Sequence, residues 1–411
     1  MMRLLYNFAN FLYSLFINIA SLFNKKAFFL VKGRRKVWDA LKGTDLSGEC
    51  YWVHCASLGE FEQGRPVIEA LRRVKPNCKI VLSFFSPSGY EVRKSYNEVD
   101  IVVYLPADSK KSAKKFISLI NPKAALFIKY EYWYHFFNEL KKRDIPLYMV
   151  SAIFRDDQIF FKWYGGWFKN ILQAVTKFFV QDESSALLLK SAGFNNYIVA
   201  GDTRFDRVVS IVDSAREVDA VKKFCNGADR VLVAGSTWVP DEKLIAGYIN
   251  SSKENEKFII APHEISGRGI ASLIEMIDIP CCRYTHIEDE SYINTRVMIV
   301  DTIGMLSSLY RYGDVAYIGG GFGSGIHNTV EPAAYGIPVV FGPRHKKFKE
   351  AVDLIICGGG FSISKSSEFL SLMTQLMRDN DTMRERAGVA AFDLVKQRVG
   401  ATLKVIKELE R

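Results

Sequence analysis

Several common signatures are missing from this 411-residue chain. It has no Walker A sequence and no strict G-x-G-x-x-G, which excludes the two best-known phosphate-binding loops. Its seven cysteines form no C-x-x-C pair, and no Cys/His spacing suits zinc. No nucleic-acid-binding motif accompanies the net charge of +10, so we expect no nucleic-acid partner. The simplest interpretation of the cysteines is reduced, buried thiols in a cytosolic protein body.

An Asp-x-Asp metal signature is present only formally, at Asp379–Asp381. It lies in a polar stretch between C-terminal helical patterns and does not follow a strand. We therefore predict a turn and a helix cap at this place, and no metal site.

Acidic residues are scarce at the start of the chain. Residues 1–45 contain eight Lys and Arg but only Asp39 and Asp45, a net charge of +6. A basic cluster of this kind next to an apolar segment predicts contact with anionic lipid.

No charged residue lies between Leu4 and Phe23, a stretch long enough to cross a bilayer. Its polar residues recur at helical spacing and form one narrow stripe: Asn7, Asn10, Ser14, Asn18 and Ser21. We predict a membrane-anchor helix over residues 1–24, either spanning the membrane or lying in its interface. A cleaved signal peptide and a buried soluble helix are the alternatives. The signal peptide is disfavoured because only Arg3 precedes the apolar run and no small-x-small site follows it.

The rest of the chain alternates short apolar runs with amphipathic helical patterns, which is typical of parallel sheets covered by helices. The pattern weakens over residues 205–229 and then restarts. We therefore predict an α/β fold with an N-terminal domain over residues 25–215 and a C-terminal domain over residues 216–411. The last helices are expected to pack either within the C-terminal domain or back on the N-terminal domain. Ligands of such sheets bind outside the carboxyl ends of the strands, here in a cleft between the two domains.

The segment Trp52–Arg65 runs from an apolar strand into a helix. Ser57, Gly59 and Glu60 then lie on the turn between them, at the carboxyl edge of the sheet. Gly59 allows close approach of backbone or ligand. A carboxylate at Glu60 can act as a general base for a sugar hydroxyl. The alternative is that Glu60 only caps the helix.

The segment Ile318–Pro343 contains a glycine-rich loop after a predicted strand, followed by a short helix over Thr329–Tyr335. Loop amides and a helix N-terminus together form an anion site, so we predict phosphate binding. Asn328 can cap the helix, and Glu331 can accept hydrogen bonds from ribose hydroxyls. The alternative is that the glycines serve tight packing only.

Two further pairs of polar residues follow strands predicted in the second domain. Ser236 and Thr237 could bind phosphate or sugar, although helix capping explains them equally well. His263 and Arg268 could neutralise a phosphate, although a lone histidine at a strand end is more often structural.

Seven segments in collinear order resemble the bacterial transferases of 3-deoxy-D-manno-octulosonic acid (Kdo) in lipopolysaccharide synthesis. They are SLGEFEQGRPVIEALR (57–72), Glu131-Tyr132-Trp133, VQDESSALLLKSAGF (180–194), GDTRFD (201–206), GSTWVPDE (235–242), DTIGML (301–306) and HNTVEPAAYGIPVVFGP (327–343). Each segment alone is weak, but the set is specific and covers most of the chain.

The resemblance implies a GT-B fold of two Rossmann-like domains facing a cleft, with the donor CMP-Kdo bound mainly by the C-terminal domain. It implies inverting transfer without a metal or other cofactor, and Glu60 as general base. The acceptor-binding residues would be Ser57, Gly59, Arg65 and Glu131. From the resemblance and the motifs above, the donor-binding residues would be Ser236, Thr237, His263, Arg268, Gly304, Gly320, Gly321, Gly325, Asn328 and Glu331.

The chain departs from the family pattern in the donor-binding part. Pro262-His263-Glu264 stands where the family usually has Pro-Arg-His, which makes Arg268 our candidate for the missing phosphate-binding arginine. Met305 stands where the family usually has a glutamate.

We therefore expect a glycosyltransferase that moves Kdo from CMP-Kdo to a lipid A precursor (lipid IVA) at the cytoplasmic face of the inner membrane. One alternative is another nucleotide-sugar enzyme of the same fold with a UDP-sugar donor, such as a lipid-disaccharide synthase or an epimerase. The other is a catalytically inactive glycolipid-binding protein.

Overall fold

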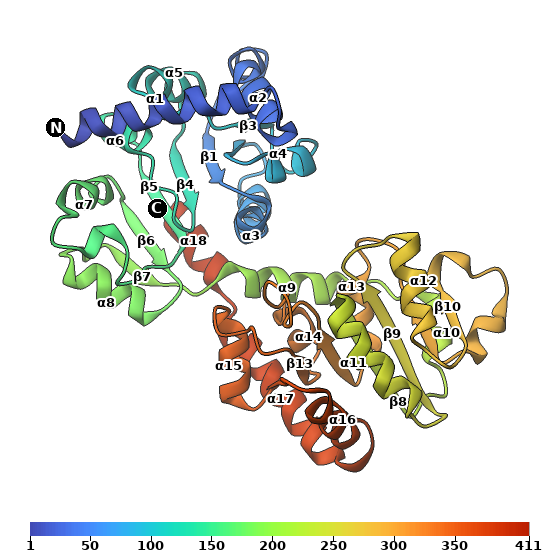
Figure 1. Cartoon of the computed structure of the whole chain (residues 1–411). Helices are drawn as coiled ribbons and strands as arrows, with labels where there is room; N and C mark the ends of the chain where they lie inside the picture. Colours follow the sequence, from blue (N-terminus) through green and yellow to red (C-terminus); the bar gives the residue numbers. More distant parts are fainter. Residues whose placement is uncertain (411) are drawn as a thin grey trace. The chain divides into compact units, whose positions relative to one another are not determined.

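The computed structural model describes residues 1–410, which fall into two compact units (Figure 1). The first unit contains residues 1–207 and the chain from Val399 onward, and the second contains residues 208–398. The sequence placed the junction at residues 215–216 instead. The boundary falls inside the continuous helix α9 (Thr203–Ser214), so no loop marks its exact position.

The first unit is built on a seven-stranded sheet in the order β3-β2-β1-β4-β5-β6-β7, with every neighbouring pair parallel. Its strands are β1 (Cys50–Cys55), β2 (Lys79–Phe84), β3 (Ile101–Tyr104), β4 (Ala124–Ile128), β5 (Leu147–Ala152), β6 (Lys177–Val180) and β7 (Tyr197–Val199). All six residues of β1 are buried. Successive residues of this strand, such as Trp52 and Val53, belong to different core clusters because helices cover both faces of the sheet.

The second unit has its own seven-stranded parallel sheet, in the order β10-β11-β9-β8-β12-β13-β14. Its strands are β8 (Arg230–Thr237), β9 (Glu256–Pro262), β10 (Cys281–Arg283), β11 (Val297–Ile299), β12 (Val315–Ile318), β13 (Val339–Phe341) and β14 (Gly360–Ser362). The sequence missed β10 and β14. Both are three-residue edge strands without an apolar run, and they depend on pairing with the neighbouring strand.

Helices flank both sheets. In the first unit these are α1 (Met2–Ala20), α2 (Lys25–Lys42), α3 (Leu58–Val74), α4 (Pro87–Arg93), α5 (Lys110–Ile120), α6 (Tyr134–Lys142), η1 (Ile159–Phe161), α7 (Gly166–Leu172), α8 (Glu183–Ser191) and α18 (Ala401–Leu409). In the second unit these are α10 (Asp219–Cys225), α11 (Val239–Asn250), α12 (Gly267–Glu275), η2 (Tyr284–His286), η3 (Glu290–Asn294), α13 (Leu306–Leu309), η4 (Tyr310–Tyr312), α14 (Val330–Ala334), α15 (Lys349–Cys357), α16 (Ser366–Thr374), the π-helical η5 (Gln375–Asp379) and α17 (Asp381–Arg398).

The final helix α18 packs in the first unit, against α3 (Figure 1). Its residues Ala401 and Val405 join the same core cluster as Val67 of α3. The carboxylate of Asp206 accepts hydrogen bonds from the amides of Gly400 (2.5 Å) and Thr402 (2.7 Å) at the start of α18. These contacts hold the end of the chain on the first unit.

The N-terminal segment forms two helices, α1 and α2, which meet at a bend of 117°. Among the described residues, no single helix meets the length and hydropathy expected of a membrane span, although this bent pair does so when taken together. Most of the basic residues of α2 are exposed. Arg34 is the exception, since its Nε donates to the carbonyl of Leu105 (3.0 Å) and its guanidinium lies over the ring of Phe85.

Helix α1 turns its polar stripe toward the protein. The hydroxyl of Tyr6 donates to Asp108 (2.6 Å), and Asn7 Oδ1 lies 2.7 Å from Nε2 of His135 at the start of α6. Asn10, Ser14 and Asn18 line cavities between α1 and the body of the unit. The apolar face is left exposed, at Leu4, Leu5, Phe8, Phe11, Leu15, Phe16 and Ile19. This arrangement is the reverse of that in an ordinary surface helix.

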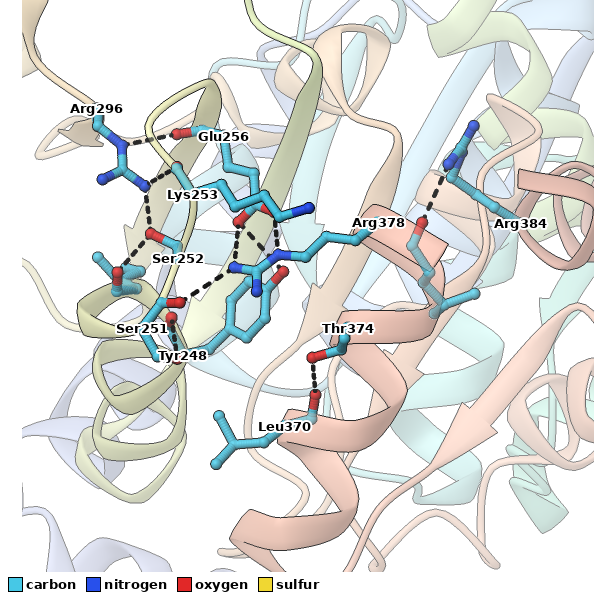
Figure 2. A network of polar contacts seen from close by, with 12 residues as sticks. Tyr248, Ser251, Ser252, Lys253, Glu256, Arg296, Leu370, Thr374, Arg378 and Arg384 are labelled. Atoms are coloured by element: carbon cyan, nitrogen blue, oxygen red, sulfur yellow. Dashed lines mark hydrogen bonds and ion pairs between the residues drawn. The ribbon is translucent and has the colours of Figure 1, made fainter. Parts of the chain in front are cut away.

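A polar network in the second unit ties η5 to the start of β9. Figure 2 shows Arg378 pointing toward Glu256, and the guanidinium donates to both carboxylate oxygens of Glu256 (2.5 and 3.1 Å). The Glu256 carboxylate is almost fully buried. Arg296 adds donors to the adjacent turn, at Ser252 and Lys253.

We expect Glu256→Ala to lower the free energy of unfolding by about 2–4 kcal/mol, because it leaves the Arg378 charge without its buried partner. Chemical denaturation measures this change. Glu217→Ala removes the solvent-exposed pair with Lys222 and is the matched control, which should unfold like the wild type. Equal stability of both variants would contradict this role of the buried pair.

Candidate functional site

In each sheet the strand order reverses beside its first strand. The loops that follow the two strands at this point diverge to opposite faces, and a crevice is left at the carboxyl ends. In the first unit the strands are β1 and β4, followed by Glu60 and Glu131. In the second unit they are β8, which contains Ser236 near its carboxyl end, and β12, which is followed by Gly320. The topology therefore brings the predicted residues of each unit to a position where α/β proteins bind ligands.

Glu60 lies in the first turn of α3 and is buried. Ser57 is the N-cap of this helix, and its hydroxyl oxygen accepts from the amide of Glu60 (3.5 Å). In return, Oε2 of Glu60 accepts from the amide of Ala56 (2.5 Å). The side chain thus has the capping role considered above, but capping uses only one of its carboxylate oxygens.

Burial, and next the negative charge of Glu131, raise the pKa of Glu60 to about 7. The nearby ammonium of Lys129 acts in the opposite direction. A carboxylate whose pKa is close to neutrality is suited to accept a proton at neutral pH.

Two ring nitrogens lie near the carboxylate of Glu131, and one of them is hydrogen-bonded to it. Nε1 of Trp133 donates to Oε2 of Glu131 (2.9 Å), and Nε2 of the fully buried His54 lies 3.7 Å from the same oxygen. Lys129, beside this group, has a φ of 69°, which is uncommon for a non-glycine residue. The sequence interpretation missed both His54 and Lys129. A histidine inside an apolar strand was the only available signal for the first.

Gly59 and Arg65 were also predicted to bind the acceptor, and the structure places them differently with respect to Glu60 and Glu131. A Cβ at Gly59 would meet nothing closer than Oγ of Ser57, at 4.0 Å, so packing within the chain does not require glycine there. Arg65 is directed elsewhere on α3. Its Nε donates to Glu69 (2.7 Å), and its guanidinium lies over the ring of Tyr96.

In the second unit the buried carboxylate of Asp241 joins the two loops at the switch point. Its Oδ2 accepts from the amides of Trp238 and Gly320, both at 2.9 Å, and its Oδ1 accepts from the hydroxyl of Tyr317 (2.7 Å). The sequence interpretation did not assign Asp241 a role. Because the Gly320 amide is already bonded within the chain, this glycine positions the loop and its amide does not point to a ligand.

Glycine is required at different positions of this loop for different physical reasons. A Cβ at Gly319 would lie 2.2 Å from the carbonyl of Ser236, and one at Gly321 would lie 2.5 Å from the backbone of Gly342. Gly320 and Gly325 have φ values of 90° and 138°, which favour glycine. Tight packing, the alternative considered for this loop, therefore explains part of its glycine content.

Three motifs of the second unit meet in one stack of rings. The ring of His263 stacks on both Trp238 (centroids 4.6 Å apart) and His327 (4.4 Å). Nε1 of Trp238 donates to Nε2 of His327 (3.2 Å). Burial, and next the neighbouring His263, lower the pKa of His327. His327 was missing from the predicted site residues, although it lies in the segment that carries the family resemblance.

Of the remaining donor-site predictions, Ser236 has a φ of 54° at the end of β8. Thr237 is buried, and its hydroxyl donates to Glu242 (3.1 Å). Asn328 caps α14 through the amide of Val330 and donates to Glu331 (2.9 Å).

Arg268 and Gly304 are further out in the sheet. Arg268 is exposed on the first turn of α12, which follows β9. Gly304 is exposed in the loop after β11, with a φ of 93°.

Within residues 1–410 no group of three or more His, Cys, Asp or Glu side chains is arranged to hold a metal ion. At the formal Asp-x-Asp segment, Asn380 Oδ1 accepts from the amide of Met383 (2.9 Å) in the first turn of α17. Asp381 pairs with Arg230 and Arg384. The predicted helix cap is therefore present, while Asp379 belongs to η5 and only Asn380 separates η5 from α17.

The proximity of the two carboxylates leads to a titration test. We expect Glu60 to titrate with a midpoint near pH 7, and Glu131→Gln to lower this midpoint because it removes a neighbouring negative charge. Carbon-13 NMR of labelled glutamate carboxyl groups, assigned with Glu60→Gln, measures both values. An unchanged midpoint in Glu131→Gln would show that the carboxylates are not coupled.

Comparisons with known proteins point to one family. Residues 30–207 match the sequence model of the 3-deoxy-D-manno-octulosonic-acid transferase (kdotransferase) family. A 3-deoxy-D-manno-octulosonic acid transferase of Aquifex aeolicus is 26% identical over 333 residues, which cover 79% of this chain and 85% of that protein. A bifunctional glycosyltransferase/methyltransferase of Fusobacterium nucleatum is 26% identical over 83% of this chain, which spans only 55% of that longer protein.

Among solved structures, a UDP-GlcNAc 2-epimerase from Neisseria meningitidis has a TM-score of 0.59 and 16% identity. The similarity covers 87% of this chain and 100% of that one. At this identity it shows the fold alone, and it agrees with the predicted pair of Rossmann-like domains.

Proposed function

Because the chain belongs to the 3-deoxy-D-manno-octulosonic-acid transferase family, we propose that this glycosyltransferase moves Kdo from CMP-Kdo to a sugar hydroxyl of a lipid A precursor, lipid IVA. The observation that carries the proposal is the buried carboxylate of Glu60, whose pKa is raised to about 7 at the switch point of the first sheet.

Glu60 is the general base in this proposal. Its carboxylate takes the proton of the acceptor hydroxyl while the hydroxyl oxygen forms a bond to the anomeric carbon of Kdo. The bond from this carbon to the phosphate oxygen of CMP breaks, and CMP leaves with the electron pair from the opposite face. Burial supports this role because a carboxylate removed from water binds a proton more tightly.

The second unit holds the donor in this proposal, and no metal is required. The ring stack of Trp238, His263 and His327 offers flat surfaces and ring nitrogens beside the glycine-rich loop. Asp241 holds that loop in place, so little reorganisation is needed when a phosphate arrives.

We also place the enzyme at the cytoplasmic face of the inner membrane, where its lipid acceptor has its tails. Support comes from α1, whose exposed face is apolar along its length. Exposed lysines at the start of α2, Lys25 and Lys26, add attraction for anionic headgroups. Such a helix fits the interface of a membrane with its apolar side toward the lipid tails.

We expect purified enzyme with a CMP-Kdo supply and tetra-acylated lipid A precursor to yield a product heavier by one or more Kdo units, as read by mass spectrometry. Glu60→Gln should lower kcat by about 100-fold or more, because the general base is lost. Asp289→Asn is the control, because it changes an exposed carboxylate at the N-cap of η3 in the second unit. Its turnover should be near that of the wild type.

The two alternatives make different predictions in the same assay. If no product forms with CMP-Kdo but the enzyme turns over a UDP-sugar, then the donor is a UDP-sugar and not CMP-Kdo. Binding of the glycolipid without any turnover would indicate an inactive binding protein. Near-wild-type turnover of Glu60→Gln would show that another group is the base.

We expect the double variant Phe8→Ser, Phe16→Ser to bind vesicles at least tenfold more weakly than the wild type, because it removes exposed apolar area from α1. Flotation with phosphatidylethanolamine and phosphatidylglycerol vesicles measures this binding. Leu187→Ser removes a comparably exposed apolar side chain from α8 and serves as the control. Equal binding of all three proteins would contradict attachment through α1.

A further inference from the structure

Three polar side chains lie together inside the first sheet. Trp52 and His54 point to the same face of β1, and Ser83 of β2 is directly opposite His54 in the register. All three residues are fully buried. Oγ of Ser83 lies 2.8 Å from Nε1 of Trp52 and 2.8 Å from Nδ1 of His54.

The chemistry of this chain determines where the histidine proton lies. The indole of Trp52 can only donate, so Ser83 Oγ accepts from it. The single hydroxyl proton of Ser83 then has Nδ1 of His54 as its acceptor. In the other tautomer this proton would be left buried without a partner, which is unfavourable. The proton of neutral His54 is therefore on Nε2.

That nitrogen faces the carboxylate pair. Nε2 of His54 is 3.7 Å from Oε2 of Glu131 and has no hydrogen-bond partner within the described residues. The ring of Phe127 packs on His54 with centroids 4.9 Å apart and helps to exclude water. With its proton on Nε2, His54 presents the positive end of an N–H dipole to Glu131.

We propose that His54 is a positioning residue for the general base: Trp52 and Ser83 fix its proton on Nε2, and this N–H holds the anionic carboxylate of Glu131 beside Glu60. The proposal rests on the proposed function for its effect on catalysis, but the arrangement itself does not require turnover. Glu131 contributes a fixed negative charge that strengthens the base, and His54 keeps this charge in place.

Other charged and titratable groups around Glu60 are accounted for. Lys129, the residue after β4, lowers the pKa of Glu60 and so acts against Glu131, and it is not substituted in any variant below. The Cys55 thiol on β1 stays protonated, because burial, and next the charge of Glu60, raise its pKa. Glu62 on α3 also acts on Cys55. Within residues 1–410 no hydrogen bond or ion pair joins Lys129, Cys55 or Glu62 to His54 or Glu131.

The test compares two amides of different reach. His54→Gln extends its amide to about the place of Nε2, whereas His54→Asn reaches only the place of Nδ1, near Ser83. We expect His54→Asn to lower the Glu60 midpoint by about half a pH unit or more, toward the value of Glu131→Gln, because an unheld Glu131 moves away from Glu60. His54→Gln should keep a midpoint close to that of the wild type.

Carbon-13 NMR of the glutamate carboxyl groups reads the midpoint in unliganded protein, and nitrogen-15 NMR of the imidazole identifies the protonated ring nitrogen. In the Glu131→Gln background, His54→Asn should cause no further change, since its target is gone. If the enzyme proves inactive on CMP-Kdo, these spectra still test the proposal. If it is active, the acid limb of kcat/KM should move with the Glu60 midpoint.

Several results would overturn the proposal: a proton on Nδ1, equal midpoints in His54→Asn and wild type, or a shift that persists without Glu131. Phe127→Leu disturbs the same packing without removing a hydrogen bond, and a midpoint shift there would indicate a merely structural role. If His54→Asn fails to fold by circular dichroism, Ser83→Ala replaces it, with a smaller shift in the same direction expected.

Discussion

Two carboxylates held beside each other in a buried crevice are the constraint on which the candidate site of the first unit depends. Glu60 and Glu131 repel each other, and burial deprives Glu60 of water. Such a pair persists only if donors surround it. The Ala56 amide and the Trp133 indole supply these donors, and both come from segments whose positions the β1–β4 pairing determines. The parallel sheet therefore provides the crevice, and it also positions the hydrogen-bond donors that stabilise the carboxylates there.

In the second unit, which has the same kind of switch point, the main physical question is how a glycine-rich loop is ordered. In the proposed function its loops receive a large anionic ligand, yet loops rich in glycine lose much conformational entropy when they become ordered. A single buried carboxylate, Asp241, bonds to both loops at the switch point and to Tyr317 between them. Hydrogen bonds within the chain thus order the loop, and this ordering does not depend on a bound ligand.

The central strands could be predicted from the sequence because their apolar runs are bounded by helical patterns. Strand β14 could not, since Gly360–Ser362 becomes a strand only through pairing with β13. The same distinction separates the site residues. Glu60 follows from local pattern and from the family resemblance, whereas the relation of His54 to Ser83 joins residues 29 positions apart. A contact that depends on strand register has no local signal in the sequence.

The apolar helix and the carboxylate pair are parts of one packed structure. Tyr13 of α1 stacks on Phe85 (6.2 Å between centroids), and Phe85 stacks on Trp133 (5.1 Å). The indole of Trp133 in turn donates to Glu131. Two ring contacts and one hydrogen bond therefore separate α1 from the carboxylate beside Glu60. The packing of α1 on this unit and the position of the Glu131 carboxylate are therefore joined by an unbroken series of side-chain contacts.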